Sequence, residues 1–259
     1  MNDKKMRLVF LTQDDPFYLA RNIDYLVKHL PPYAEVVATV VFDVSPFGKR
    51  ESFTDKMKKT LDIFGLPFFV RYGVKFVKSK LDPRNNVRKV LEGFKIPLIQ
   101  IEGNINKDEN LAKIKAYQPD LLVSIAGNQI FRQKLLDTAT HGCINLHTAL
   151  LPKYRGLMPS FWVLRHNEKR TGVSVFFVDE GIDSGPILVQ NPVEIGNMSQ
   201  EELIHVTKKM GMDAILEAID KIHSGNYQLQ KNDASQMTYF TFPTKEDVQA
   251  FKAAGKKFY

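Results

Sequence analysis

The chain has 259 residues, of which 44% are hydrophobic and 25% charged, and its formal net charge is +7. This composition is typical of a globular protein with one substantial core, and the longest apolar run, residues 63–77, is too short and too charged to span a bilayer. A single cysteine excludes an intrachain disulfide and a thiolate metal cluster. The first residues lack the long apolar region of a secretory signal, so we expect a cytoplasmic protein with no membrane partner.

Short apolar runs and helical periodicity alternate along the first part of the chain. Strands are predicted at residues 6–11, 35–42, 97–101, 121–125 and 143–146, and helices at 18–30 and 107–116. Between residues 51 and 94 the periodicity is helical, which predicts a helical insertion within the domain. Strands that alternate with helices favour an α/β, Rossmann-like fold whose mostly parallel sheet carries helices on both faces.

The second part of the chain contains two further strands, a long helix and a terminal segment. The strands are predicted at residues 171–177 and 187–193, and Ser199 and Glu202 form a capping box that begins a helix ending before Gly225. Residues 226–259 are too few to build a core alone, so we expect an accessory segment packed on a catalytic domain of residues 1–225. Its aromatic residues should bury against that domain: Tyr227, Tyr239, Phe240, Phe242 and Phe251.

The stretch from residue 141 to 188 carries groups suited to catalysis at a carbonyl. Asn145 and His147 lie two residues apart on a predicted strand, so their side chains share one face. Asp183 follows in a loop flanked by glycines, where Asp179 is a second carboxylate better suited to forming the turn. An amide, an imidazole and a carboxylate can stabilise an oxyanion and exchange protons with a nucleophile. Because no third strong ligand accompanies His147 and Asp183, no metal is expected.

Asn145-x-His147, the run Leu-Leu-Pro-Lys-Tyr-Arg-Gly at residues 150–156, and Asp183 together resemble the signature of formyltransferases that use 10-formyltetrahydrofolate. That family includes glycinamide ribonucleotide, methionyl-tRNA and sugar N-formyltransferases, and the resemblance is clearest from about residue 95 to 225. It implies that Asn145, His147 and Asp183 are catalytic. Arg155 could bind a substrate phosphate or carboxylate, or equally tie its own loop to backbone carbonyls.

The resemblance also implies that the folate pteridine is held largely by backbone groups of two loops, residues 125–130 and 178–183. The first loop departs from the family pattern, because Ala-Gly-Asn-Gln-Ile replaces a more apolar run. The matching positions are Ile125, Ala126, Asn128, Ile130, Val178, Asp179 and Gly181.

The acceptor of the formyl group is inferred by elimination. Residues 12–17, after the first strand, contain two aspartates and a proline where a glycine-rich phosphate loop would stand, which disfavours glycinamide ribonucleotide. Residues 226–259 are too few for the additional domain that tRNA formylation normally needs. The net charge would suit an anionic acceptor, but the basic groups at residues 56–59 and 75–80 are interleaved with apolar residues, as in solvated helices.

We therefore expect a small amine as acceptor, best an amino sugar nucleotide, with no nucleic-acid partner and a possible homo-oligomer. The alternatives are an enzyme resembling the methionyl-tRNA or glycinamide ribonucleotide formyltransferases, or a non-catalytic folate-binding module. A nicotinamide-dependent oxidoreductase is disfavoured, since no Gly-x-Gly-x-x-Gly follows the first strand.

Overall fold

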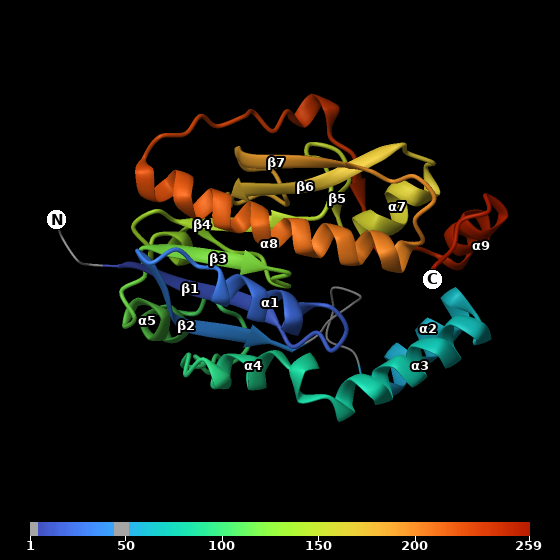
Figure 1. Ribbon diagram of the computed structural model, residues 1–259, viewed down its shortest axis with the longest axis horizontal. Coiled ribbons are helices and arrows are strands. Elements are labelled where there is room, and N and C mark those ends of the chain that lie inside the picture. The colour runs from blue at the N-terminus through green and yellow to red at the C-terminus, as the bar shows by residue number, and fades with distance from the viewer. Residues whose placement is uncertain (1–4, 44–51) are drawn as a thin grey trace.

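The computed structural model of the chain describes residues 5–43 and 52–259. Its centre is a six-stranded sheet with the order β2-β1-β3-β4-β6-β7 (Figure 1). The strands are β1 (Met6–Gln13), β2 (Ala34–Phe42), β3 (Leu121–Ile125), β4 (Cys143–His147), β6 (Arg170–Phe177) and β7 (Ile187–Glu194). Strands β2, β1, β3 and β4 are parallel, whereas β6 and β7 run antiparallel to their neighbours. The predicted Rossmann-like, mostly parallel sheet is confirmed.

Helices cover both faces of this sheet because alternate strand residues point to opposite sides. Leu8 and Phe10 of β1 belong to the core formed with α1 (Leu19–Lys28), α4 (Val87–Gly93) and α8 (Gln200–Ser224). Val9 and Leu11 belong to the core formed with α5 (Asp108–Lys115) and α6 (Gln133–Leu136). Cys143 is buried in this second core, where burial raises the pKa of its thiol, so it is the inert apolar residue predicted.

The strand predicted at residues 97–101 is reduced to an isolated bridge between Thr39 and Leu98. The amide of Thr39 donates to the carbonyl of Pro97, and the amide of Ile99 donates to the carbonyl of Thr39. Proline has no amide hydrogen and cannot extend such a ladder, which limits the segment to the edge of β2. The prediction of a full strand here is wrong.

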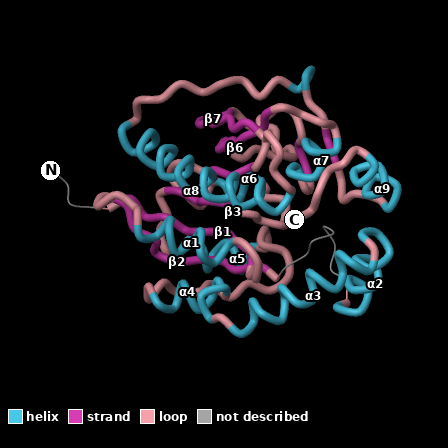
Figure 2. The backbone as a smooth tube through the Cα atoms, turned by 45° about the vertical axis from the view of Figure 1, so that its right-hand side comes forward, coloured by secondary structure: helices cyan, strands magenta, loops and turns pink. Residues whose placement is uncertain are grey.

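The helical segment predicted between residues 51 and 94 contains α2 (Phe53–Phe64), α3 (Leu66–Leu81), a 3₁₀ turn (Pro83–Asn85) and α4. Its predicted start at Glu51 lies outside the described residues. Figure 2 shows α2 and α3 at one end of the molecule, close to α9 (Lys245–Ala253). Polar contacts fix α3 to the body. Among them, the ammonium of Lys75 pairs with the carboxylate of Glu201, and the hydroxyls of Tyr72 and Tyr18 lie 3.3 Å apart.

The long helix α8 begins and ends where the sequence predicts. Ser199 accepts a hydrogen bond from the amide of Glu202, whose carboxylate accepts one in return from the amide of Ser199. The helix stops at Gly225, which takes a left-handed backbone conformation that glycine adopts without strain. Among the described helices, α8 included, none is long and apolar enough to cross a membrane.

The C-terminal segment packs against the rest of the chain through a 3₁₀ turn (Ala234–Gln236), β8 (Tyr239–Phe240) and α9. Strand β8 pairs with β5 (Arg155–Gly156), and Phe251 of α9 is fully buried against Phe161 of α7 (Pro159–Arg165). Phe240 and Phe242 pack on the same cluster. Tyr227 and Tyr239, by contrast, are 36% and 48% exposed, so the expectation that all five aromatics bury is wrong for these two.

Candidate active site

Strand β4 presents Asn145 and His147 at its carboxyl end. Asn145 pairs with Ser124 of β3 and Phe176 of β6, and His147 is the last residue of the strand, opposite Ser174. The neighbouring Ile144 and Leu146 point into the core under α8. Asn145 and His147 therefore project from the opposite face of the strand, as their spacing predicts.

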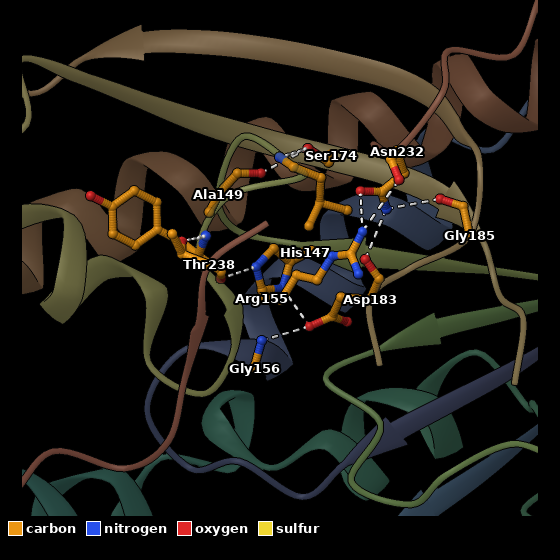
Figure 3. A network of polar contacts seen from close by, with 11 residues as sticks. His147, Ala149, Arg155, Gly156, Ser174, Asp183, Gly185, Asn232 and Thr238 are labelled. Carbon is orange, nitrogen blue, oxygen red and sulfur yellow. Dashed lines mark hydrogen bonds and ion pairs between the residues drawn. The ribbon is translucent and has the colours of Figure 1, made fainter. Parts of the chain in front are cut away.

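His147 is held between two oxygen acceptors (Figure 3). Its side chain is buried, its Nε2 lies 2.7 Å from the carbonyl oxygen of Tyr154, and its Nδ1 lies 3.5 Å from Oδ2 of Asp183. A carbonyl can only accept, so the hydrogen bond to Tyr154 requires the proton on Nε2. Nδ1 is then the basic nitrogen, and it faces the carboxylate of Asp183. This arrangement can take up a proton at Nδ1, because the resulting imidazolium donates on both sides.

Asp183 is fixed by the loop that follows β4. Its Oδ2 accepts a hydrogen bond of 2.8 Å from the amide of Gly156, and its backbone adopts a left-handed conformation with φ of 49°. Gly156 has φ of 94°, and a Cβ atom there would lie 2.2 Å from the carbonyl oxygen of Phe240. Only glycine fits this position, because a side chain would collide with the backbone of β8. The loops that carry Asp183 and Gly156 are thus packed tightly against each other and against β8.

A pocket with a cavity volume of about 350 Å³ lies beside Asn145 and Asp183. Five residues expected to bind folate line it: Asn128, Ile130, Val178, Asp179 and Gly181. Ile125 and Ala126 do not, although both were expected to. The side chain of Ile125 is fully buried in the sheet core, and the carbonyl of Ala126 accepts a hydrogen bond from the side chain of Gln13. His147 is also not a lining residue.

Several pocket residues were not predicted from the sequence, notably Gln13, Ser124, Phe131 and Tyr239. Gln13 ends β1 and Ser124 lies near the end of β3. Since the carboxyl ends of parallel strands meet at one edge of a sheet, the strand prediction itself contained the signal for these two. Tyr239 comes from the C-terminal segment, and no local pattern connects it to the site.

Asp179 stabilises the turn that carries Asp183. Its Oδ1 accepts hydrogen bonds from the amide of Gly181 at 3.0 Å and from the hydroxyl of Ser184 at 2.5 Å. These are the contacts of a turn-forming aspartate. The geometry agrees with the interpretation that Asp183, and not Asp179, faces the histidine.

The sequence left two roles open for Arg155, substrate binding and a contact within the protein, and the structure shows the contact within the protein. It is 5% exposed, and its Nη2 donates to Oδ1 of Asn232 at 2.7 Å. The side-chain nitrogen of Asn232 in turn donates to the carbonyls of Asp183 at 2.8 Å and Gly185 at 3.0 Å. A buried guanidinium needs such partners, and Asn232 links it to the loop that carries Asp183.

Thr238 holds the other side of the same loop. Its hydroxyl accepts from the amide of Tyr154 at 2.8 Å, and its carbonyl accepts from the amide of Arg155 at 2.9 Å. The phenol of Tyr154 donates to Glu168, and burial together with this carboxylate raises the pKa of the phenol above its usual range. The C-terminal segment and Glu168 therefore position the carbonyl of Tyr154, which accepts the hydrogen bond from His147.

In the loop after β1, a carboxylate binds backbone amides that could otherwise contact a phosphate. Asp15 accepts hydrogen bonds from the amides of Phe17 and Tyr18, both at 2.7 Å, at the point where α1 begins. Asp14 lies 3.7 Å from the guanidinium of Arg88. A carboxylate thus occupies the donors that an anionic ligand would use. Across residues 5–43 and 52–259, no group of three His, Cys, Asp or Glu side chains is arranged to hold a metal ion.

Comparison with known proteins identifies the family. The family model described as formyl transferase matches residues 79–219, which is more than half of the chain. The chain belongs to the formyl transferase family. The methionyl-tRNA formyltransferase of Kosmotoga olearia is 37% identical over 165 residues, a match that covers 62% of this chain and 52% of the relative. This chain thus spans about half the length of the curated relatives it matches.

Solved structures share the fold of this chain at low sequence identity. A Helicobacter canadensis N-formyltransferase, in complex with folinic acid and dTDP-3-aminofucose, aligns with a TM-score of 0.57 and 17% identity over 96% of this chain and 80% of that one. A phosphoribosylglycinamide formyltransferase from Anaplasma phagocytophilum aligns with a TM-score of 0.61 and 15% identity, covering 92% of this chain and all of that one. At these identities the likeness concerns the fold alone.

Proposed function

We propose that this chain transfers a formyl group from 10-formyltetrahydrofolate to the primary amine of a small acceptor, with Asn145, His147 and Asp183 as the catalytic residues. The observation that carries the proposal is the convergence of these three side chains beside a pocket, within a chain that belongs to the formyl transferase family. The folate supplies the activated formyl group. The protein residues orient the reactants, stabilise charge and carry protons.

The pocket suits the pteridine of a reduced folate. Its volume of about 350 Å³ lies at the lower end of the range for small-molecule sites, roughly 300–1,000 Å³. Apolar side chains such as Ile130, Phe131 and Val178 can sandwich a flat ring, while the backbone amides of Asn128 and Gln129 can donate hydrogen bonds to its edge. We assign folate binding to the loops around residues 127–131 and 178–183.

The chemistry follows from the geometry of the three residues. When the amine attacks the formyl carbon, negative charge develops on the formyl oxygen, and the side-chain amide of Asn145 can donate to it. The attacking nitrogen must lose a proton. The Nδ1 atom of His147 and the carboxylate of Asp183, 3.5 Å apart, can receive it and return it to the departing nitrogen of the donor. His147 donates to the carbonyl of Tyr154, and Asp183 accepts from the amide of Gly156, so both groups are held in position.

We favour an amino sugar nucleotide as the acceptor. The carboxylate of Asp15 occupies the amides that a ribonucleotide phosphate would need, which disfavours glycinamide ribonucleotide. We propose that residues 1–225 form a catalytic domain and that residues 226–259 are its accessory segment. This segment packs on the domain and lines its pocket through Tyr239. The net charge of +7 favours an anionic carrier such as a nucleotide. The Helicobacter canadensis N-formyltransferase, which has the same fold, was solved in complex with folinic acid and dTDP-3-aminofucose, and this supports an amino sugar nucleotide as the acceptor class.

Methionyl-tRNA is the second candidate acceptor, because two curated relatives that are 37% and 35% identical to this chain, over 52% of their own length, are methionyl-tRNA formyltransferases. An acceptor panel separates the candidates. We expect transfer from 10-formyltetrahydrofolate to an amino sugar nucleotide with kcat/KM in the usual enzymatic range, roughly 10⁴ M⁻¹s⁻¹ or above. Transfer at such a rate to methionyl-tRNA, with none to the sugar nucleotide, would overturn the acceptor assignment. Folate binding without transfer to any amine would instead indicate a non-catalytic module.

A further inference from the structure

Helix α3 carries an apolar stripe on its outer side. Five large apolar side chains that are 51–78% exposed form it: Leu66, Val70, Val74, Val77 and Leu81. Their spacing of three or four residues places them along one face, over about 22 Å at 1.5 Å per residue. The opposite face carries the residues that pack on the body, including Phe68, Tyr72 and Lys75. The stripe therefore does not contribute to the core.

Positive charge accompanies this stripe. Residues 53–81 contain seven Lys or Arg and two Asp, so the hairpin of α2 and α3 contributes +5 to the net charge of +7. Helix α3 itself contains no acidic residue. At 3.6 residues per turn, Lys78 and Lys80 project on either side of the stripe. On α2, Phe53, Met57 and Leu61 are also 40% or more exposed.

We propose that the outer face of α3 docks on an anionic lipid surface. An apolar stripe flanked by lysines is the pattern of helices that lie in the plane of a membrane interface. An anionic bilayer supplies both an apolar layer and dispersed negative charge, and it requires no matching shape. A second copy of the chain fits less well, because a two-fold contact would bring two faces of the same positive charge together.

This peripheral contact is not a membrane span, but it departs from the expectation that the protein has no membrane partner. The contacts of α3 show how docking would orient the catalytic body. Lys75 pairs with Glu201 of α8, and Phe17, in the loop after β1, packs edge-on against Tyr72 at 5.5 Å between ring centroids. The helix is therefore attached firmly to the carboxyl end of the sheet, where the pocket lies. A docked protein would hold its active site at a fixed angle to the membrane.

Vesicle co-sedimentation of the full chain tests the proposal. We expect binding to vesicles of phosphatidylglycerol and phosphatidylcholine, little binding to pure phosphatidylcholine, and a decrease with salt because exposed charges are screened. Lys78→Gln combined with Lys80→Gln should weaken binding by roughly 25-fold, since each cation near an anionic surface contributes about fivefold. The matched control exchanges two exposed lysines of the α5 region, Lys107→Gln with Lys115→Gln, and should bind as the natural chain does.

The apolar stripe is tested separately with Val70→Ser, Val74→Ser and Val77→Ser combined. Valine and serine have similar helix propensities, and circular dichroism will verify that the helix persists. This variant should lose vesicle binding by on the order of tenfold or more, whereas Leu229→Ser, at an exposed site elsewhere, should not. Equal binding by the stripe variant and the natural chain would overturn the proposal. The proposal would also be overturned if the natural chain did not bind vesicles. A further contrary result would be a dimer of the natural chain in light scattering that the stripe variant does not form.

Discussion

Asn232 connects the C-terminal segment to the proposed catalytic carboxylate, and its replacement by alanine removes three hydrogen bonds. The side chain donates to the carbonyls of Asp183 and Gly185 and accepts from the guanidinium of Arg155. Two neutral bonds at about 1 kcal/mol each and one charge-assisted bond at about 1.5–3 kcal/mol predict a loss of about 4 kcal/mol in the free energy of unfolding. Because domains are typically stable by about 5–15 kcal/mol, the variant should remain largely folded.

The effect on turnover should exceed what partial unfolding explains. The carbonyl of Asp183 loses its anchor, and a displacement of about 1 Å in a reacting group can lower the rate by on the order of a hundredfold. Asn232→Asp separates positioning from stability. An aspartate can still accept from Arg155, but it cannot donate to the carbonyls of Asp183 and Gly185. We expect Asn232→Asp to retain more stability than the alanine variant and yet to show a similarly reduced kcat.

The assay is urea unfolding together with kcat and KM for formyl transfer. Asn226→Ala, at an exposed site in the same segment, is the control and should leave all three quantities unchanged. If folded Asn232→Ala kept the natural kcat, Asn232 would have no positioning role. The same conclusion would follow if Asn232→Asp recovered stability and kcat in parallel.

Three further predictions concern the loops around the site and the two segments packed beside it. Gly156→Ala should lower both stability and kcat, because its Cβ would collide with the backbone of β8. Gly196→Ala is the control: its φ is also positive, but it has no neighbour within 4 Å. It should lower the free energy of unfolding by only roughly 1–2 kcal/mol, the cost of a left-handed residue. Burial alone would raise the pKa of Glu201, but the hydrogen bond and charge of Lys75 lower it in the folded protein. The ionised Glu201 should therefore stabilise the fold above its ordinary pKa of about 4.3, and this contribution should be lost as pH falls through the lower folded value. Unfolding of Glu201→Gln and the natural chain should therefore differ at pH 7 and converge in acid, and a constant difference would contradict this reasoning. Hydrogen exchange should protect the amides of α9, and truncation after residue 225 should lower the melting temperature; unprotected amides there would make the segment a loose appendage.

The sequence predicted the elements whose signals are local. Alternating apolar runs located β1, β3 and β4, and the capping box located the start of α8. The spacing of Asn145 and His147 placed both side chains on one face of β4. Asp183 required the family motif, because its approach to His147 depends on two loops that are distant from each other in the sequence.

Contacts without a periodic pattern could not be predicted. Asn232 lies in an irregular loop, and its partners Asp183 and Arg155 are 49 and 77 residues away in the chain. The buried role of Arg155 depends on that partner, so the sequence left two interpretations equally open. The exposed stripe of α3, by contrast, does have a periodic pattern. Its spacing is that of a buried helix face, and only the packed structure shows which side of an amphipathic helix faces the core.

The most direct test of the proposed function measures formyl transfer and folate binding in the same variants. His147→Ala and Asp183→Asn should bind 5-formyltetrahydrofolate, a stable analogue of the donor, about as tightly as the natural chain does. His147 does not line the pocket, and the asparagine at position 183 has nearly the size of the aspartate that it replaces. Single-turnover transfer from 10-formyltetrahydrofolate should nevertheless fall by about a hundredfold or more in each variant, since each loses a proton carrier. Near-natural transfer rates in folded variants would contradict the assignment of His147 and Asp183 as catalytic residues.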